Sequence, residues 1–317
     1  MNIVVTGGFG FIGSNFINIY WKDSIDSKIQ PTIYCLDSLT YAANPHNIDL
    51  EIRNSANFHH INLDIANSTQ VEAFIESQNF DACIHFAAES HVDRSIEDPL
   101  IFARTNFIGT ANLIDSWTRH QTTRFIHVST DEVYGSIEIG STREDGQLNP
   151  SSPYSASKAA SDLLVLSHVT TFGVDAVVTR CTNNYGPGQN SEKLLPKIID
   201  CIKHDVEIPI YGDGEYSREW IHVADHCFAI LRLLNAPNLK ENVYNIGSGF
   251  ELTNLELVKI LASYAPEKKI KIVHVEDRLG HDRRYSLDSS RIKTELGWEP
   301  TISFEKGSKG LFDSLKE

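Results

Sequence analysis

Tyr154 and Lys158 are the two side chains of this sequence with the clearest capacity for acid–base chemistry. They lie four residues apart in the segment YSASK, and residues at this spacing share one face of a helix. A lysine ammonium beside a tyrosine favours the phenolate, which turns a group with a pKa of about 10 into a usable base. The same spacing also occurs in ordinary surface pairs, so the surrounding segments must decide between the two interpretations.

Two adjacent acids, Asp131 and Glu132, lie in the segment STDEVYG. The segment follows an apolar run and is expected at the C-terminal end of a strand, where open α/β sheets bind their ligands. One carboxyl group that donates a proton and one that accepts a proton would suit an elimination. Without this context, an Asp-Glu pair in a loop is usually a solvated turn.

Three glycines, Gly7, Gly10 and Gly13, follow the first apolar run in the segment TGGFGFIG. Glycine lets a turn tighten and lets the backbone approach a pyrophosphate, while the N-terminus of the next helix supplies N–H donors. The motif alone could be a plain glycine turn, but the strand before it and the helix after it favour a dinucleotide site.

Asp37 closes the second expected strand, where a carboxylate can accept hydrogen bonds from the adenosine ribose. Ser38 and Leu39 follow it rather than an arginine, and a carboxylate repels a 2′-phosphate, so the sequence favours NAD over NADP. Asp64 and Ile65 follow the third strand, where they could flank an adenine, although Asp64 could equally be a surface aspartate.

The elements that must position these residues alternate between strands and helices in the first half of the chain. Such alternation is typical of a doubly wound parallel sheet, a Rossmann-like α/β fold. We expect strands at residues 2–6, 32–37, 57–61, 82–87, 124–129 and 175–180, and helices at residues 11–22, 68–77, 99–119 and 154–171.

The character of the chain changes after Tyr185, where Gly186, Pro187 and Gly188 follow closely. Beyond them, shorter segments predict a smaller, interleaved C-terminal α/β region. We expect helices at residues 193–203, 225–234 and 255–264, and strands at residues 207–211 and 242–247.

Composition narrows the range of partners. The chain has 317 residues, of which 41% are hydrophobic, and its net charge is 28 − 42 = −14. A nucleic-acid groove is therefore not expected, because the phosphate backbone requires clustered basic residues. We see neither a membrane-spanning stretch nor a signal peptide, and the five scattered cysteines form no CxxC pair. These features predict a cytoplasmic protein without a structural metal.

Motifs spread over nearly the whole chain carry a family resemblance. They are TGGFGFIGSNF, LTYAANPHNI, FAAESHVDRSIEDP, STDEVYG, SPYSASKAASD, TRCTNNYGP, EKLLP, PIYGDGEYSREWIHVADH, YNIGSG and RLGHDRRYSLD. With them the chain resembles the extended short-chain dehydrogenases/reductases and, among these, the dTDP-glucose 4,6-dehydratases. The Asp131-Glu132 pair distinguishes dehydratases from epimerases and decarboxylases of the same fold. One departure is GPGQNSE at residues 186–192, where the family more usually has the pattern YGPYQxPEK.

The resemblance implies a lyase with an internal redox cycle. Tyr154, assisted by Lys158, would take the C4 hydroxyl proton of the glucosyl unit while NAD⁺ accepts the C4 hydride, and Thr130 would hydrogen bond the developing carbonyl. Glu132 would then remove the C5 proton as Asp131 protonates the departing C6 hydroxyl. NADH would finally return its hydride to C6 as C5 is reprotonated.

The resemblance also implies the binding residues and the domains. An NAD-binding domain is expected at residues 1–182, joined by 220–250, and a sugar-nucleotide domain at residues 183–219 and 251–317. The expected cofactor-binding residues are Gly7, Gly10, Phe11, Ile12, Gly13, Asp37, Asp64, Ile65, Ala87, Ala88, Thr105, Tyr154, Lys158 and Asn184. The expected substrate-binding residues are Ser90, Thr130, Asn183, Lys193, Leu194, Pro209, Tyr211, Arg218, Asn254, Arg278 and His281.

Three alternative functions stay open, and a quaternary structure is also expected. A UDP-glucose 4,6-dehydratase or a sugar-nucleotide epimerase would share the fold, and a non-catalytic NAD-binding scaffold would be a different class of protein. The resemblance further implies a homodimer in which the helices at residues 99–119 and 154–171 form a four-helix bundle. Apolar positions compatible with that bundle are Leu113, Leu163, Leu164 and Leu166.

Overall fold

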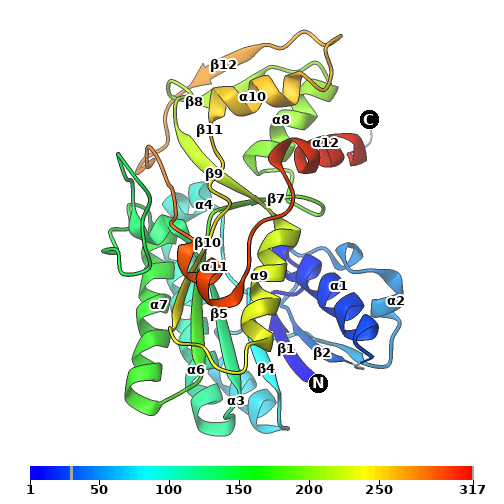
Figure 1. The fold of residues 1–317 in the computed structure, drawn as a ribbon, viewed down its shortest axis with the longest axis vertical. Coiled ribbons are helices and arrows are strands. Elements are labelled where there is room, and N and C mark those ends of the chain that lie inside the picture. Colours follow the sequence, from blue (N-terminus) through cyan, green and yellow to red (C-terminus); the bar gives the residue numbers. More distant parts are fainter. Residues whose placement is uncertain (29–30, 316–317) are drawn as a thin grey trace.

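The computed structural model describes residues 1–28 and 31–315, and its centre is a seven-stranded parallel sheet (Figure 1). The strands lie side by side in the order β10-β6-β5-β4-β1-β2-β3. Their bounds are β1 Asn2–Thr6, β2 Thr32–Leu36, β3 Phe58–Ile61, β4 Ala82–His85, β5 Arg124–Thr130, β6 Ala176–Cys181 and β10 Val243–Ile246. This arrangement confirms the doubly wound α/β fold expected from the sequence.

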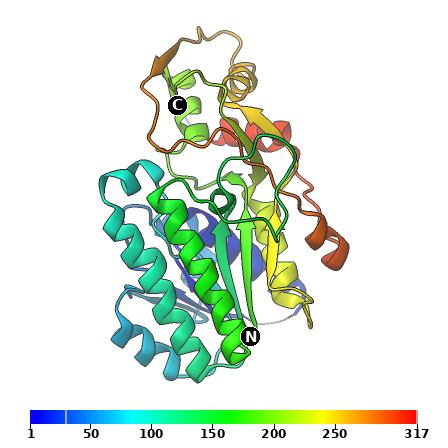
Figure 2. The same cartoon turned by 90° about the vertical axis from the view of Figure 1, so that its left-hand side faces the viewer.

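Helices cover both faces of this sheet, which explains why β4 and β6 are buried along their whole length. Phe16, Ile230 and Ile292 pack on one face, and Ile75, Trp117 and Val165 pack on the other. The first face carries α1 (Phe11–Asp26), α9 (Val223–Asn235) and α11 (Ser290–Leu296). The second carries α3 (Ser68–Glu76), α6 (Gly109–His120) and α7 (Pro153–Phe172), and Figure 2 shows α6 and α7 lying side by side.

The segment expected as one helix at residues 99–119 consists of two α-helices joined by a π-helix. It begins as α5 (Pro99–Phe102), widens into a π-helix, η2 (Ala103–Ile108), and continues as α6. Asn106 in η2 is buried, and its amide donates to Ser157 Oγ at 2.8 Å and to the Glu89 carbonyl at 3.0 Å. π-Helical turns are frequent at functional sites, and this one joins the helix to the loop before α4 (Val92–Glu97).

A second, smaller region sits beyond the C-terminal ends of the large sheet (Figure 1). Its own core includes Leu195, Trp220, Leu257 and Phe312. It contains a three-stranded sheet of order β11-β9-β7 and a two-stranded sheet of β12 and β8. The bounds are β7 Asn183–Tyr185, β8 Ile208–Tyr211, β9 Ser217–His222, β11 Glu251–Thr253, β12 Ile272–Val275, α8 Leu194–Lys203, α10 Asn254–Ala262 and α12 Phe304–Ser314.

The two regions are interleaved along the chain. β9 belongs to a small sheet, yet α9 follows it directly and β10 then pairs in parallel with β6 of the large sheet. The domain boundaries named above stay a prediction, and residues 316–317 of the second domain lie outside the described residues. Among residues 1–28 and 31–315, no helix is both long and apolar enough to cross a membrane.

Candidate active site

A cavity of about 1550 Å³ opens between the large sheet and the smaller region, at the C-terminal ends of the strands. Every residue named from the sequence for catalysis or binding lines it, from Gly7 at one end to His281 at the other. The structure therefore brings together residues from the turn after β1, from β2, β5 and α7, and from the C-terminal region. Their individual roles remain predictions. Within the described residues, no cluster of three or more His, Cys, Asp or Glu side chains could hold a metal ion.

The glycine turn after β1 has the shape that a dinucleotide requires. Gly7 has φ +65°, and a Cβ atom there would lie 2.7 Å from the Ala87 backbone. A Cβ on Gly13 would lie 2.3 Å from the Gly7 carbonyl oxygen. At Gly10 no side chain caps α1, so the first N–H groups of the helix face the cavity for an anion. The turn therefore fits a pyrophosphate.

Asp37 lies at the end of β2 and is held in place by the backbone. Its carboxylate accepts hydrogen bonds from the N–H of Phe9 at 3.0 Å and of Leu39 at 2.8 Å. A carboxylate has about four acceptor positions, so capacity remains for ribose hydroxyls. Asp64 is more exposed and pairs with Arg104 at 3.3 Å at the rim of the same cavity.

The acid pair lies in the short helical turn η3 (Asp131–Tyr134) that ends β5. Thr130 Oγ1 donates to Asp131 Oδ1 at 3.1 Å and accepts from the Glu132 N–H at 3.3 Å. Asp131 is only 2% exposed, and its Oδ2 has no hydrogen-bond partner among the described residues. A buried polar atom of this kind, facing a cavity, is available for a bound molecule.

The two acids differ in electrostatic environment. Burial raises the pKa of Asp131 well above its usual value, and the neighbouring Glu132 and Glu219 raise it further. Burial also raises the pKa of Glu132, but Arg278 and Arg218 oppose this effect. Asp131 is therefore the better proton donor at neutral pH, and Glu132 is the better proton acceptor.

Tyr154 and Lys158 lie in the first two turns of α7. The helix begins with Pro153, and Ser152 and Ser155 form a reciprocal capping box that fixes the first turn. Lys158 is 4% exposed, and its Nζ donates to the Val128 carbonyl at 2.6 Å. Burial, followed by Glu132, raises the pKa of Tyr154 well above its usual value. Formation of the Tyr154 phenolate therefore requires a positive charge nearby, and the Lys158 ammonium can provide it.

Two arginines from the C-terminal region also line the cavity and act electrostatically on Glu132. Arg218 is buried above the Tyr285 ring and donates to the Asp282 carbonyl at 2.9 Å, an uncharged partner. The Arg278 guanidinium lies 3.8 Å from Asp93 Oδ1. Neither guanidinium is occupied by a close surface salt bridge, so both can meet phosphate oxygens in forked geometry.

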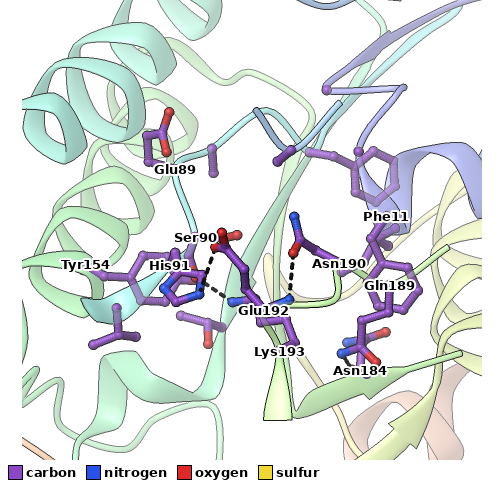
Figure 3. A pocket seen from close by; sticks show the side chains of 18 of the residues that line it. Phe11, Glu89, Ser90, His91, Tyr154, Asn184, Gln189, Asn190, Glu192 and Lys193 are labelled. Atoms are coloured by element: carbon purple, nitrogen blue, oxygen red, sulfur yellow. Dashed lines mark hydrogen bonds and ion pairs between the residues drawn. The ribbon is translucent and has the colours of Figure 1, made fainter. Parts of the chain in front are cut away.

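The loop before α8 lines the cavity, and besides the predicted Lys193 it carries Gln189, Asn190 and Glu192, which the sequence reasoning missed. Glu192 Oε2 lies 3.4 Å from His91 Nε2, and Lys193 Nζ donates to the Ser90 carbonyl at 2.8 Å, as Figure 3 shows. Gln189 and Asn190 line the cavity beside them. The sequence showed that residues 186–192 depart from the family pattern. It did not show that residues of this loop form hydrogen bonds with residues about 100 positions earlier in the chain.

Comparison with known proteins assigns the chain to a family. A family model described as GDP-mannose 4,6 dehydratase matches residues 4–311. A dTDP-glucose 4,6-dehydratase of Streptomyces niveus is 45% identical over 309 residues, which are 97% of this chain and 90% of that protein. The crystal structure of DesIV, a dTDP-glucose 4,6-dehydratase from Streptomyces venezuelae with NAD and TYD bound, matches with a TM-score of 0.92 and 41% identity, covering 99% of this chain and 96% of that one. The chain belongs to the dTDP-glucose 4,6-dehydratase family.

Membership of the dTDP-glucose 4,6-dehydratase family confirms the resemblance found in the sequence motifs. It also agrees with the cofactor expected from the glycine turn, since DesIV was crystallised with NAD. The fold itself is shared more widely, because a UDP-glucose 4-epimerase from Thermotoga maritima matches with a TM-score of 0.88 at 28% identity, covering 99% of this chain and 98% of that one. Within this fold, the acid pair after β5 is the feature that the sequence analysis associates with dehydration.

Proposed function

We propose that the protein converts dTDP-glucose to dTDP-4-keto-6-deoxyglucose and water, with NAD as a cofactor that is regenerated in every turnover. The proposal is supported by the family membership and by the glycine cradle beside Asp37. The observation that carries it is the contrast between Asp131 and Glu132, because an elimination needs one proton donor and one proton acceptor in the same site.

The chain's own residues account for the proton transfers. Tyr154 takes the C4 hydroxyl proton, with the Lys158 ammonium stabilising the phenolate and Thr130 donating to the developing C4 carbonyl. The C4 ketone makes the C5 proton acidic, and Glu132 removes it. Asp131 gives its proton to the C6 hydroxyl, which leaves as water. NAD, held by the glycine turn and Asp37, would supply the redox chemistry by accepting the C4 hydride and returning it to C6, and C5 would be reprotonated in that last step.

The cationic end of the cavity would hold the diphosphate. Arg218 and Arg278 present guanidinium groups there, and the chain's net charge of −14 makes such a local cluster necessary for binding an anion. The sugar would then lie between this end and the acid pair, with Lys193 and Asn183 from the loop and strand beside it.

The direct test is incubation with dTDP-glucose and UDP-glucose in parallel, followed by mass spectrometry. The proposal expects a product lighter by one water from dTDP-glucose and slower conversion of UDP-glucose. Faster conversion of UDP-glucose would favour the uridine alternative, and a product of unchanged mass epimerised at C4 would favour the epimerase. Absence of any product would leave the non-catalytic NAD-binding scaffold.

We also propose a homodimer, formed through α5, η2, α6 and α7. Leu100, Ile108, Leu163 and Phe172 are exposed apolar residues on these helices. Of the positions named from the sequence, Leu163 is exposed, whereas Leu164 and Leu166 are partly buried against the core. Leu113, on α6, is fully buried in the core and cannot contact a second chain.

Light scattering tests the homodimer. The proposal expects about twice the chain mass of 35.5 kDa, and a single-chain mass after the substitutions Leu100→Asp and Leu163→Asp. Ile139→Asp is the control, because Ile139 is even more exposed but lies outside these helices, on the loop between η3 and α7. A wild-type protein with the mass of one chain at micromolar concentration would contradict the proposal.

A cytoplasmic location is proposed from the cysteines. All five are buried and free of disulfide bonds, which suits a reducing compartment. Fractionation of cells expressing the protein tests this, and recovery in an extracellular or membrane fraction would contradict it.

A further inference from the structure

A buried carboxylate lies one helical turn beyond the lysine of the catalytic pair. Asp162 follows Lys158 by four residues on α7 and is 0% exposed. Its Oδ2 accepts from Arg180 Nε at 2.9 Å, and its Oδ1 lies 3.5 Å from His127 Nε2. None of these three residues lines the cavity or was assigned a role above.

The fold places this group directly beneath the active site. Ser129 of β5 pairs with Arg180 of β6, and side chains alternate along each strand, so His127, Ser129 and Arg180 point to the same face of the sheet. α7 covers that face, as seen in Figure 2. The Lys158 ammonium and the Asp162 carboxylate therefore share one water-poor layer between helix and sheet.

The charges in this layer are few. Lys158 and Arg180 are cations, and Asp162 is the carboxylate that Arg180 contacts. The titratable neighbours are neutral at pH 7. Burial lowers the pKa of His127 to about 4 and that of His85, on β4, well below its usual value. Burial raises the pKa of Cys181 on β6 to about 12, and it raises that of Tyr134 on η3.

The other elements packed against this layer contribute uncharged groups. From η2, Asn106 bonds Ser157 and Ser161, and from α6, the Thr110 hydroxyl bonds His85. Glu144 meets Arg180 through its backbone carbonyl at 3.2 Å, while its carboxylate binds the Asn245 N–H and lies 3.5 Å from Arg291. Asp162 is thus the carboxylate placed to balance a cation in this layer.

Asp162 is ionised and acts on Lys158. Burial alone would raise the pKa of Asp162, but His127 and Arg180 outweigh burial and leave it below its usual value. Burial lowers the pKa of Lys158 to about 8, and Asp162 opposes that fall. Charges interact strongly where water is excluded, so a change at Asp162 reaches the lysine without any contact with substrate.

We propose that Asp162 is a positioning residue for the reaction: its buried carboxylate keeps the Lys158 ammonium charged and in place beside Tyr154, and Arg180 limits the strength of that effect. The inference rests on the proposed function, because it assigns to Lys158 the stabilisation of the Tyr154 phenolate. Without the carboxylate, two buried cations share one layer, and Lys158 loses its proton at lower pH.

The test is the pH profile of C4 oxidation, followed as NADH absorbance in a single turnover with dTDP-glucose. In the wild type, the rate should fall at alkaline pH as Lys158 deprotonates. In Asp162→Asn, this alkaline limb should move down by about one pH unit or more. In Arg180→Gln it should move up, because Asp162 is then less neutralised. If Asp162 and Arg180 had a purely structural role, the alkaline limbs of the two variants would move in the same direction or would not move.

Three further variants keep the test decisive. Asp162→Asn/Arg180→Gln removes both partners of the buried ion pair together, so neither is left without the other and this variant should fold where a single variant does not. Its alkaline limb should also move down. Asp162→Glu should restore the wild-type limb. Asp115→Asn, which removes an exposed carboxylate from the neighbouring α6, should leave the limb in place.

The outcomes separate the two proposals. A wild-type protein that forms no product from dTDP-glucose contradicts the proposed function. An active wild type with unshifted limbs in Asp162→Asn and in the double variant overturns the role of Asp162 alone.

Discussion

Asp131 and Glu132 are consecutive residues whose carboxyl groups lie in different electrostatic surroundings. Asp131 is buried, accepts a hydrogen bond from Thr130, and has its pKa raised further by Glu132 and Glu219, whereas Arg278 and Arg218 oppose the effect of burial on Glu132. The pKa of both is raised by burial, but only that of Asp131 is moved well above its usual value. At neutral pH the Asp131 carboxyl group therefore carries a proton more readily than that of Glu132, as an elimination requires.

The protein should purify with NAD bound, because a cofactor regenerated in each turnover need not leave the site. Denaturing the purified protein and separating the released nucleotides should yield close to one NAD per chain. No released dinucleotide, together with no gain of activity on addition of NAD, would contradict this expectation.

Gly13→Ala should strongly reduce retention of NAD. A Cβ at this position would lie 2.3 Å from the Gly7 carbonyl oxygen, so the turn that faces the pyrophosphate must open. The measurement is bound NAD per chain after gel filtration, with the thermal unfolding midpoint recorded in parallel. Gly310→Ala is the matched control, since a Cβ there has no neighbour within 4 Å. Equal NAD content in the two variants would contradict the expectation.

Asp225→Asn should destabilise the protein by about 1–3 kcal/mol. Asp225 is buried on α9 and accepts hydrogen bonds from the N–H and hydroxyl of Thr301 and from the Ile302 N–H at 2.9 Å, which tie the C-terminal segment to the large sheet. An asparagine presents one NH₂ group to these donors. Urea unfolding measures the loss, and Asp313→Asn, which removes an exposed carboxylate paired with Lys309, should cost less than about 1 kcal/mol.

The unfolding free energy should fall as the pH drops below about 6.5, the pKa of an unfolded histidine. Burial lowers the pKa of His226 to about 3 and that of His127 to about 4, so the unfolded chain binds protons in this window while the folded chain does not. The contribution of these neutral histidines to the unfolding free energy is complete above pH 6.5, and it is lost as the pH falls toward their pKa values in the folded state.

Urea unfolding at pH 7 and pH 5 measures this loss, and His226→Gln should flatten the difference. Replacement of the exposed His46 by Gln should leave it as in the wild type. An identical pH dependence in all three proteins would show that buried histidines do not govern it.

Sequence reasoning succeeded where the chemistry is local in the chain. The glycine turn, Asp37 and the Tyr154-Lys158 pair each depend on a strand end or on one helical turn, and both kinds of spacing can be read directly from residue types. It failed where residues far apart meet. Glu219, from β9, is fully buried, raises the pKa of Asp131, and accepts from the backbone N–H of Gly249 and Leu287, an arrangement that no periodicity predicts.

The π-helical turn η2 is a second limit. Residues 103–108 contain neither Gly nor Pro, so their pattern predicts a continuous helix. The widening accompanies tertiary hydrogen bonds of Asn106 with Glu89 and Ser161, and such bonds between distant segments leave no local signal. For the same reason the buried pair of Asp162 and Arg180 was not predicted from the sequence.

The central claim is that Glu132 removes the C5 proton and Asp131 protonates the departing hydroxyl. Asp131→Asn should still oxidise C4 but lose water about 10²- to 10⁴-fold more slowly. Glu132→Gln should also oxidise C4 and then stall, without exchange of the C5 hydrogen. Tyr154 and Lys158 are unchanged in both variants, so NADH should accumulate in each.

The most direct measurement of this claim is transient NADH absorbance with dTDP-glucose in D₂O, combined with mass analysis of deuterium at C5. We expect NADH to accumulate in both variants, and deuterium to appear at C5 in Asp131→Asn but not in Glu132→Gln. Wild-type C5 exchange in Glu132→Gln, or absence of NADH in either variant while substrate still binds, would contradict it.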